Sequence, residues 1–241
     1  MRDYREEFES RVAFIRDLLQ STGASGVVFG NSGGKDSALV GILCKAACEN
    51  TLGVIMPCAS RRNYGQDADD GRALAEQFGI ECRVVDLTAV RAAEMAELEK
   101  VTALNDMAIT NLAPRLRMTT LYAIAAAENR LVAGTGNRSE AYMGYFTKWG
   151  DGASDFNPIS DLTATEVFAF LEYLGAPRAI IDKAPSAGLF DGQTDEAEMG
   201  VTYKAIDDYL LTGAVSEADK AVIDRYHRRS EHKRRPITTY R

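Results

Sequence analysis

The sequence predicts an α/β fold with a doubly wound, mostly parallel sheet and helices on both faces. Two observations lead to this prediction. Short apolar runs alternate with longer segments whose apolar residues recur at helical spacing, which is the pattern of strand–helix–strand units. A glycine-rich turn also joins the first apolar run to the helix after it, as happens at the ligand-binding edge of such sheets.

The first half of the chain supplies most of the predicted sheet. Residues 4–19 form a predicted helix, because charged residues separate apolar ones at helical spacing. Strands covered on both faces are mainly apolar, and three such runs follow at residues 26–30, 52–56 and 82–86. Helices are predicted between them at residues 36–50 and 69–78.

Helices dominate the second half of the chain. Two alanine-rich helices are predicted at residues 88–104 and 114–129, followed by a fourth strand at residues 131–134. Further helices are predicted at residues 163–174, 203–211 and 217–229. The segments without regular periodicity are predicted loops, at residues 58–67, 142–161 and 183–200. The first and last of these loops are polar and are candidate lids.

The turn after the first strand has the chemistry of an anion site. Backbone N–H groups point out of such a turn, and the helix N-terminus adds positive potential. Ser32 and Ser37 add hydroxyl donors, whereas the Asp36 carboxylate would repel a phosphate unless a cation lay between them. Asp36 therefore indicates Mg²⁺ bridging to a polyphosphate. The turn comprises Gly30, Asn31, Ser32, Gly33, Gly34, Lys35, Asp36 and Ser37.

This turn does not match the two best-known phosphate-binding patterns. The Walker pattern requires glycine where Phe29 stands and Ser or Thr where Asp36 stands. The dinucleotide-binding fingerprint fails on its glycine spacing. The remaining pattern, Ser-Gly-Gly-x-Asp-Ser at residues 32–37, resembles the pyrophosphate loop of the N-type ATP pyrophosphatases. An ordinary glycine-rich turn is the alternative.

Two further segments carry residues suited to a nucleotide. The fourth strand ends in Gly-Thr-Gly-Asn at residues 134–137, and its carboxyl end can neighbour that of the first strand. Thr135 and Glu140 are therefore expected at the same nucleotide, with Glu140 sharing the metal ion with Asp36. Residues 144–158 combine glycines, aromatic residues, one lysine and acids, as a pocket for a base or pyridine ring requires.

Together these motifs resemble those of the ammonia-dependent NAD synthetases, a family within the ATP pyrophosphatases. The matching motifs occur in the same order from residue 30 to residue 236. The set as a whole is specific for this family, whereas each motif alone is not. The motifs are Ser-Gly-Gly-x-Asp-Ser (32–37), Asn-x-x-x-Arg-x-Arg-Met (111–118), Gly-Thr (134–135), Gly-Tyr-Phe-Thr-Lys (144–148), Gly-Asp-Gly-x-x-Asp (150–155), Asn-Pro (157–158), Lys-Ala-Pro-Ser-Ala (183–187) and Glu-His-Lys-Arg-Arg-Pro (231–236). The resemblance implies a Rossmann-like fold of the adenine nucleotide alpha hydrolase type.

The resemblance implies a ligase that uses ATP to amidate deamido-NAD with ammonia, the final step of NAD biosynthesis. In such an enzyme residues 30–37 bind the ATP phosphates, and Asp36 and Glu140 bind Mg²⁺. Thr135 and Ser186 contact ATP. The residues implied in deamido-NAD binding are Asn111, Arg115, Lys148, Asp155, His232 and Lys233. Families of this kind build the deamido-NAD site at a dimer interface, so a homodimer is implied as well.

The expected chemistry follows from the poor electrophilicity of a carboxylate. Attack of the nicotinate carboxylate on the α-phosphate of ATP would give an acyl-adenylate and release pyrophosphate, and ammonia would then displace AMP. The phosphate loop and Mg²⁺ would stabilise the departing pyrophosphate, so no protein nucleophile is required. Asp36 and Lys148 are the predicted catalytic residues. Asp151, Asp155 and Lys148 remain alternatives for deprotonating ammonium.

One position departs from the family pattern. Many members have a lysine in the helix-opening motif after Asn-Pro, where a second cation meets the ATP phosphates. Here that position is Ala164, which removes one positive charge from the site. Lys35, at the variable position of the phosphate loop, is a candidate to replace it.

Composition limits the remaining possibilities. At 241 residues, 46% of them hydrophobic, the chain is predicted to form one domain. Its nucleotide-binding core is expected at about residues 22–175 and its C-terminal helices and basic tail at about residues 200–241. No apolar run is long enough to span a membrane and no leader is recognised, which predicts a cytoplasmic protein without a membrane partner. Four cysteines without a Cys-x-x-Cys pair do not indicate a structural metal.

The net charge of −7 argues against a general nucleic-acid binder, although residues 225–241 carry +6. This basic tail is either a solvated end or a clamp for a phosphate-rich ligand. The nearest rival function is a tRNA-modifying ATP pyrophosphatase, which would need a nucleic-acid surface. A regulatory nucleotide-binding module without turnover is a second rival, favoured only by Ala164.

Overall fold

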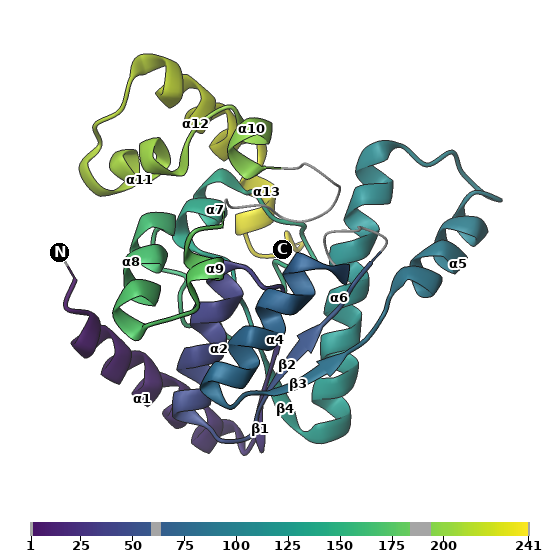
Figure 1. Cartoon of the computed structure of the whole chain (residues 1–241). Helices are drawn as coiled ribbons and strands as arrows, with labels where there is room; N and C mark the ends of the chain where they lie inside the picture. Colours follow the sequence, from purple (N-terminus) through teal and green to yellow (C-terminus); the bar gives the residue numbers. More distant parts are fainter. Residues whose placement is uncertain (1, 59–63, 184–193, 241) are drawn as a thin grey trace.

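A parallel sheet of four short strands forms the centre of the described residues, which are 2–58, 64–183 and 194–240 of the computed structural model (Figure 1). The strands are β1 (Gly26–Gly30), β2 (Thr51–Ile55), β3 (Glu81–Val84) and β4 (Arg130–Ala133). Their order across the sheet is β3-β2-β1-β4, and every pair is parallel. The predicted parallel sheet is confirmed, and the point where the strand order reverses lies between β1 and β4. Ligands of open α/β sheets bind at this point.

Helices cover both faces of the sheet, which confirms the doubly wound arrangement (Figure 1). On one face, α2 and α4 contact the strands, while α1 and α8 pack against α2. On the opposite face, α6 contacts β1 and β4, and α5 packs against α6. The bounds are α1 (Tyr4–Thr22), α2 (Lys35–Ala47), α4 (Gln66–Phe78), α5 (Thr88–Leu98), α6 (Asp106–Glu128) and α8 (Ala164–Leu174).

Alternate side chains of β1 enter two different cores. Val27 and Phe29 pack in the cluster that includes Leu39 of α2, whereas Val28 packs with Ala113 and other residues of α6. The three strand side chains are fully buried, and burying each is worth about 1.5–3 kcal/mol. This alternation explains why the strand is apolar throughout, since both of its faces are covered.

The predicted start of α6 was wrong. The helix begins at Asp106, because the side chain of Asn105 accepts the backbone N–H of Ala108 and caps it. Pro114, the predicted first residue, lies inside the helix, where proline cannot donate a backbone hydrogen bond. In contrast, α5 ends at Leu98, six residues earlier than predicted.

The described residues also include four short helices that were not predicted. These are α7 (Arg138–Met143), α9 (Arg178–Ile181), α10 (Asp195–Met199) and α13 (Glu231–Arg234). They are too short to show a hydrophobic period. Parts of the two predicted lids, residues 59–63 and 184–193, lie outside the described residues.

The predicted C-terminal helices α11 (Tyr203–Thr212) and α12 (Glu217–Arg229) are confirmed. They pack on α7 and α8 around the fully buried side chains of Ile206, Ile223 and Met143. This cluster joins the C-terminal helices to the predicted nucleotide-binding core. It agrees with a single domain, which stays a prediction. None of the helices in the described ranges combines the length and apolar character that a membrane crossing requires.

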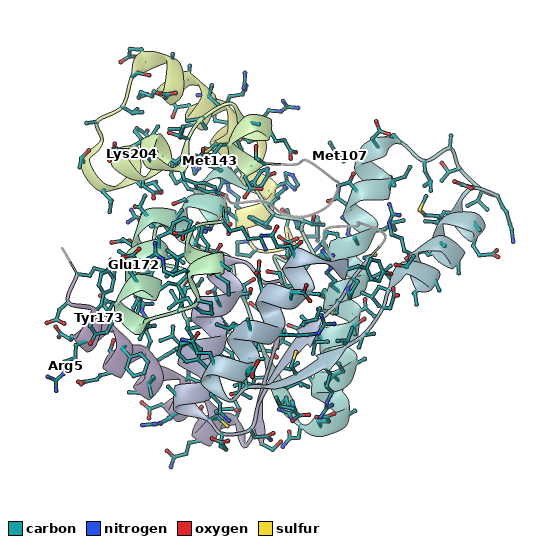
Figure 2. The ribbon with its side chains drawn as sticks, viewed as in Figure 1. Arg5, Met107, Met143, Glu172, Tyr173 and Lys204 are labelled. Atoms are coloured by element: carbon teal, nitrogen blue, oxygen red, sulfur yellow. The ribbon has the colours of Figure 1, made fainter. Side chains whose placement is uncertain are left out.

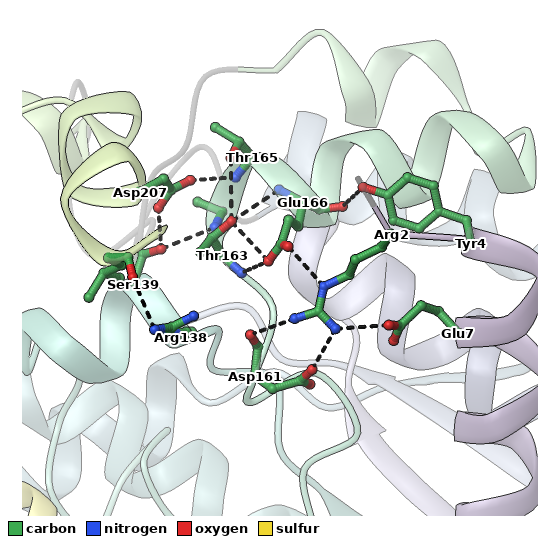
Figure 3. A network of polar contacts seen from close by, with 12 residues as sticks. Arg2, Tyr4, Glu7, Arg138, Ser139, Asp161, Thr163, Thr165, Glu166 and Asp207 are labelled. Carbon is green, nitrogen blue, oxygen red and sulfur yellow. Dashed lines mark hydrogen bonds and ion pairs between the residues drawn. The ribbon is translucent and has the colours of Figure 1, made fainter. Parts of the chain in front are cut away.

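A polar network fixes the N-terminus of α8 (Figure 3). The Ala164 N–H donates to Ser139 Oγ at 3.1 Å, and the Thr165 N–H donates to Asp207 Oδ2 at 2.7 Å. Ser139 in turn donates to Asp207 Oδ1. On the outer side, Arg2 Nε donates to Glu166 Oε1 at 2.8 Å, which ties the start of the chain to the same helix.

Replacing Asp207 by alanine should destabilise the protein by about 3 kcal/mol, because it leaves the buried Ser139 hydroxyl without an acceptor and the Thr165 N–H without a partner. The free energy of unfolding from urea titration measures this loss. Asp208→Ala is the matched control, since among the described residues the Asp208 side chain pairs with Lys204, and both side chains are largely exposed. That control should cost below about 0.5 kcal/mol. Equal losses in the two variants would contradict the role of the network.

Candidate functional site

The turn between β1 and α2 places hydroxyl and backbone groups at the carboxyl edge of the sheet. The Oγ atoms of Ser32 and Ser37 lie 3.0 Å apart, and the Gly34 N–H donates to Ser32 Oγ at 3.3 Å. Gly34 is the N-cap of α2 and supplies no side-chain cap. The first N–H groups of α2 can therefore bind an anion.

The path of this turn depends on glycine at position 33. Gly33 has φ 70°, and a Cβ atom there would lie 2.1 Å from the carbonyl oxygen of Asp67. Both the backbone conformation and the contact exclude a side chain. The turn is consequently held against the start of α4.

Asn137 joins the two predicted metal-binding carboxylates. Its Nδ2 donates to Asp36 Oδ1 at 3.0 Å, and its backbone N–H donates to Glu140 Oε2 at 3.0 Å. The Glu140 N–H donates back to Asn137 Oδ1, which completes a capping box at the start of α7. The ends of β1 and β4 therefore meet at one site, as predicted from the sheet.

Negative charge accumulates at this point. Burial, together with the charge of Asp36, raises the pKa of Glu140 to about 8. Lys35 Nζ donates to Asp36 Oδ2 at 2.5 Å. Burial opposes the charge on Lys35, but the carboxylates of Asp36 and Glu140 prevail and raise the pKa of Lys35. The site is thus short of positive charge even with the lysine in place.

A bound divalent cation would supply the positive charge that the site lacks. Mg²⁺ is usually held by one or two carboxylates together with substrate phosphates and water, and Asp36 and Glu140 offer such a pair. Within the described ranges, no group of three or more His, Cys, Asp or Glu side chains is placed to hold a metal ion. The remaining ligands of a bound Mg²⁺ would therefore be phosphate and water oxygens.

A cavity of about 1020 Å³ opens above the phosphate loop. At one end it is lined by the loop, Thr135 and Glu140. Elsewhere its lining includes residues of α6, of the segment after α7, and of α12 and α13. The basic residues among them are Arg117, Arg225, Arg229, His232 and Lys233. One cavity therefore combines a phosphate-loop site with a cationic surface.

Comparison with known proteins identifies the family. The model of the family described as NAD synthase matches residues 7–237. The chain belongs to this NAD synthase family. A relative from Carboxydothermus hydrogenoformans, named NH(3)-dependent NAD(+) synthetase, is 49% identical over 236 residues, covering 97% of this chain and 96% of that protein.

Two solved structures of similar synthetases share the fold. The NMN synthetase of Francisella tularensis superposes with a TM-score of 0.94 at 40% identity, covering 100% of this chain and 99% of that chain. The NH3-dependent NAD synthetase of Campylobacter jejuni, solved with a nitrate ion, gives a TM-score of 0.80 at 28% identity and covers both chains fully. These likenesses confirm the predicted Rossmann-like α/β fold.

Most of the residues predicted from the resemblance to NAD synthetases lie in the cavity. They are Gly30, Asn31, Ser32, Lys35, Asp36, Ser37, Asn111, Thr135, Glu140, His232 and Lys233. Gly33 and Gly34 complete the loop. Ser186 lies outside the described residues. The roles of these residues toward ligands stay predictions.

Three predicted deamido-NAD residues do not line the cavity of the single chain. Arg115 is exposed and donates to the carbonyl oxygen of Lys148 at 3.4 Å. Lys148 Nζ donates to the carbonyl oxygen of His232 at 2.7 Å. Asp155 is exposed, and its Oδ2 accepts the backbone N–H of Val132 at 2.8 Å.

Arg117, to which the sequence assigned no role, lines the cavity in place of Arg115. Its Nε donates to the carbonyl oxygen of Met56 at 3.1 Å. Residues two apart on a helix point in nearly opposite directions, so only one of the two arginines can face inward. The motif alone does not say which, because the orientation of α6 depends on its packing.

Lys183 is a second residue whose position the sequence did not reveal. Its Nζ lies 2.7 Å from both Asp67 Oδ1 and Asp70 Oδ2, and it donates to the carbonyl oxygen of Gly33 at 3.2 Å. Lys183 is nearly buried and ties the chain after α9 to the phosphate loop. Its acidic partners are more than a hundred residues away, which no local pattern can indicate.

The structure shows the surroundings of Ala164, the position at which many members of the family have lysine. Ala164 is fully buried at the start of α8, and the phosphate-loop lysine approaches the same helix. Lys35 Nζ lies 5.6 Å from the ring centre of Phe168, one turn along from Ala164, and 5.3 Å from that of Tyr203. This position agrees with the hypothesis that Lys35 replaces the missing family lysine.

Proposed function

We propose that the chain is an ammonia-dependent NAD synthetase, a ligase that converts deamido-NAD, ATP and ammonia into NAD, AMP and pyrophosphate. The observation that carries the proposal is one cavity that combines the phosphate loop and its carboxylate pair with a cationic surface. The family match supports this function over a tRNA-modifying pyrophosphatase. The intact pairing of Asp36 and Glu140 through Asn137 favours an active enzyme over a regulatory module.

Position and charge account for the first half of the reaction. The N-terminus of α2, Ser32 and Ser37 bind the phosphates of ATP, and Lys35 adds a positive charge. Asp36 and Glu140 would hold Mg²⁺, which when bound would stabilise the negative charge of the pyrophosphate. A carboxylate oxygen of the nicotinate attacks the α-phosphorus, the bond to the β-phosphate oxygen breaks, and an acyl-adenylate forms.

Amide formation follows from the activated carbonyl. Ammonia attacks the carbonyl carbon, the bond from that carbon to the bridging oxygen breaks, and AMP leaves with that oxygen. A proton is lost from the attacking nitrogen. Asp151 lines the cavity, whereas Asp155 does not, which favours Asp151 as the carboxylate that accepts this proton.

We further propose that the enzyme works as a cytoplasmic homodimer. Arg115, Lys148 and Asp155 lie outside the cavity of one chain, as expected if they complete the site of a second copy. The predicted catalytic role of Lys148 would then be exerted across that interface. The four cysteines are unpaired, which suits a reducing compartment.

A mononucleotide acceptor is the second candidate substrate. The structure that superposes with a TM-score of 0.94 is named an NMN synthetase, whereas the Campylobacter NAD synthetase gives 0.80. NMN is the amide of deamido-NMN, so adenylation and amidation of that smaller acceptor would follow the same steps. The phosphate loop and the carboxylate pair serve either acceptor.

Steady-state assays with both acceptors test the proposal. With ATP, Mg²⁺ and ammonium, we expect deamido-NAD to yield NAD with one AMP and one pyrophosphate per amide. A higher kcat/KM for deamido-NMN would favour the second candidate instead. Pyrophosphate release without an amide product from either acceptor would contradict both.

A further inference from the structure

Two arginines of α12 lie on the same side of the helix at the cavity. Arg225 and Arg229 are four residues apart, so their side chains are neighbours on the helix surface. Both are exposed and both line the cavity. Two like charges at this spacing destabilise a helix. An interaction that offsets their repulsion is therefore expected.

Neither guanidinium is neutralised within the described part of the chain. No hydrogen bond or ion pair joins the side chain of Arg225 or Arg229 to a described residue, and Arg225 only approaches the ring of Tyr226, at 5.9 Å. Earlier on the same helix, Lys220 is paired with Asp224 at 2.9 Å. The charge pairing on α12 therefore stops where the helix reaches the cavity.

The end of α12 is held in place by the segment after α7. Ser230 Oγ donates to the carbonyl oxygen of Met143 at 3.1 Å. Lys233 Nζ donates to the carbonyl oxygens of Gly144 and Phe146, at 2.8 and 2.6 Å. These hydrogen bonds hold in place the end of α12 that carries the two arginines. Exposed Met107 lies at the N-terminal end of α6 (Figure 2). It lines the same cavity.

We infer that Arg225 and Arg229 form a subsite for a phosphate of the acceptor nucleotide. The inference rests on the proposed function. Guanidinium groups match phosphate oxygens in paired hydrogen bonds, and the phosphates of ATP already have a site in the loop before α2. Both candidate acceptors carry a phosphate on the nicotinate ribose, and deamido-NAD carries a second one on its adenosine side.

Single substitutions Arg225→Ala and Arg229→Ala test the subsite. Each should raise the KM for the acceptor by about tenfold to a hundredfold, the loss expected for one charge-assisted hydrogen bond. The KM values for ATP and ammonium should stay within about twofold. Arg228→Ala is the matched control, because it removes the same charge from α12 at a position that does not line the cavity.

The acceptor whose KM changes shows which phosphate the subsite binds. Equal effects on deamido-NAD and deamido-NMN would assign the subsite to the phosphate that they share, whereas an effect on deamido-NAD alone would assign it to the adenosine-side phosphate. An unchanged acceptor KM, a rise in the KM for ATP instead, or an equal effect of Arg228→Ala would overturn the inference.

Calorimetric binding of each acceptor, without ATP, separates this inference from the proposed function. Wild-type protein that binds an acceptor but forms no amide would contradict the function alone, and weaker binding by the two arginine variants would still support the subsite. Wild-type protein that binds neither acceptor would overturn the subsite.

Discussion

Asp36→Ala should lower kcat for pyrophosphate release by about 10³-fold, because it removes both a proposed Mg²⁺ ligand and the partner of Lys35. Asp36 lies in the first turn of α2 and is itself a residue of the phosphate loop. Its loss also leaves Lys35, only 6% exposed, without its hydrogen-bonded carboxylate. Steady-state assays at saturating ATP and acceptor, repeated across a Mg²⁺ titration, measure the effect.

The variant Asp36→Asn removes the negative charge of this side chain but keeps its shape. The amide oxygen can still accept from Asn137, so the capping box and the turn should persist and the melting temperature should change little. Activity should nevertheless fall nearly as far as in the alanine variant, with a higher Mg²⁺ requirement. Near wild-type turnover at the usual Mg²⁺ concentration in Asp36→Asn would contradict the metal role of this carboxylate.

Gly33→Ala should lower kcat/KM for ATP by at least about 10²-fold, since the loop must move to admit the methyl group. The positive φ costs alanine about 1–2 kcal/mol, and the new Cβ atom would stand 2.1 Å from Asp67 O. Because backbone surrounds this position, no flexible side chain can yield. Initial rates at varied ATP concentration measure the loss.

Gly79→Ala provides the matched control. Gly79 has φ 64°, close to that of Gly33, but among the described residues the nearest atom to its Cβ would be Lys45 Cε, at 4.0 Å. This substitution should therefore cost stability without changing the kinetics for ATP. If Gly33→Ala kept the wild-type kcat/KM for ATP, the fixed path of the phosphate loop would not matter to the reaction.

The strands and long helices could be predicted because their patterns are local. Strand β1 is apolar at every position between its glycines, and α2 follows a turn whose composition permits few other structures. The predicted start of α6 at Pro114 differs from the observed start at Asp106, because the side chain of Asn105 caps the helix there. Packing then tolerates Pro114 inside the helix.

The site was predictable wherever function is concentrated in one short segment. The candidate phosphate loop was identified from residues 30–37, and Asp36 and Glu140 were expected near each other because the carboxyl ends of the first and fourth strands can be neighbours. The linking role of Asn137 was not assigned, although Asn137 and Glu140 have the spacing of a capping box. Contacts such as that of Lys183 with Asp70 depend on the finished fold, because they join segments far apart in the sequence.

The transfer of a carboxylate oxygen tests the central claim most directly. Deamido-NAD labelled with ¹⁸O in the nicotinate carboxylate is incubated with the enzyme, ATP, Mg²⁺ and ammonium, and the products are examined by mass spectrometry. Attack on the α-phosphorus predicts one ¹⁸O atom in AMP for each NAD formed and none in pyrophosphate. Unlabelled AMP alongside NAD, or label in pyrophosphate, would contradict an acyl-adenylate formed at this site.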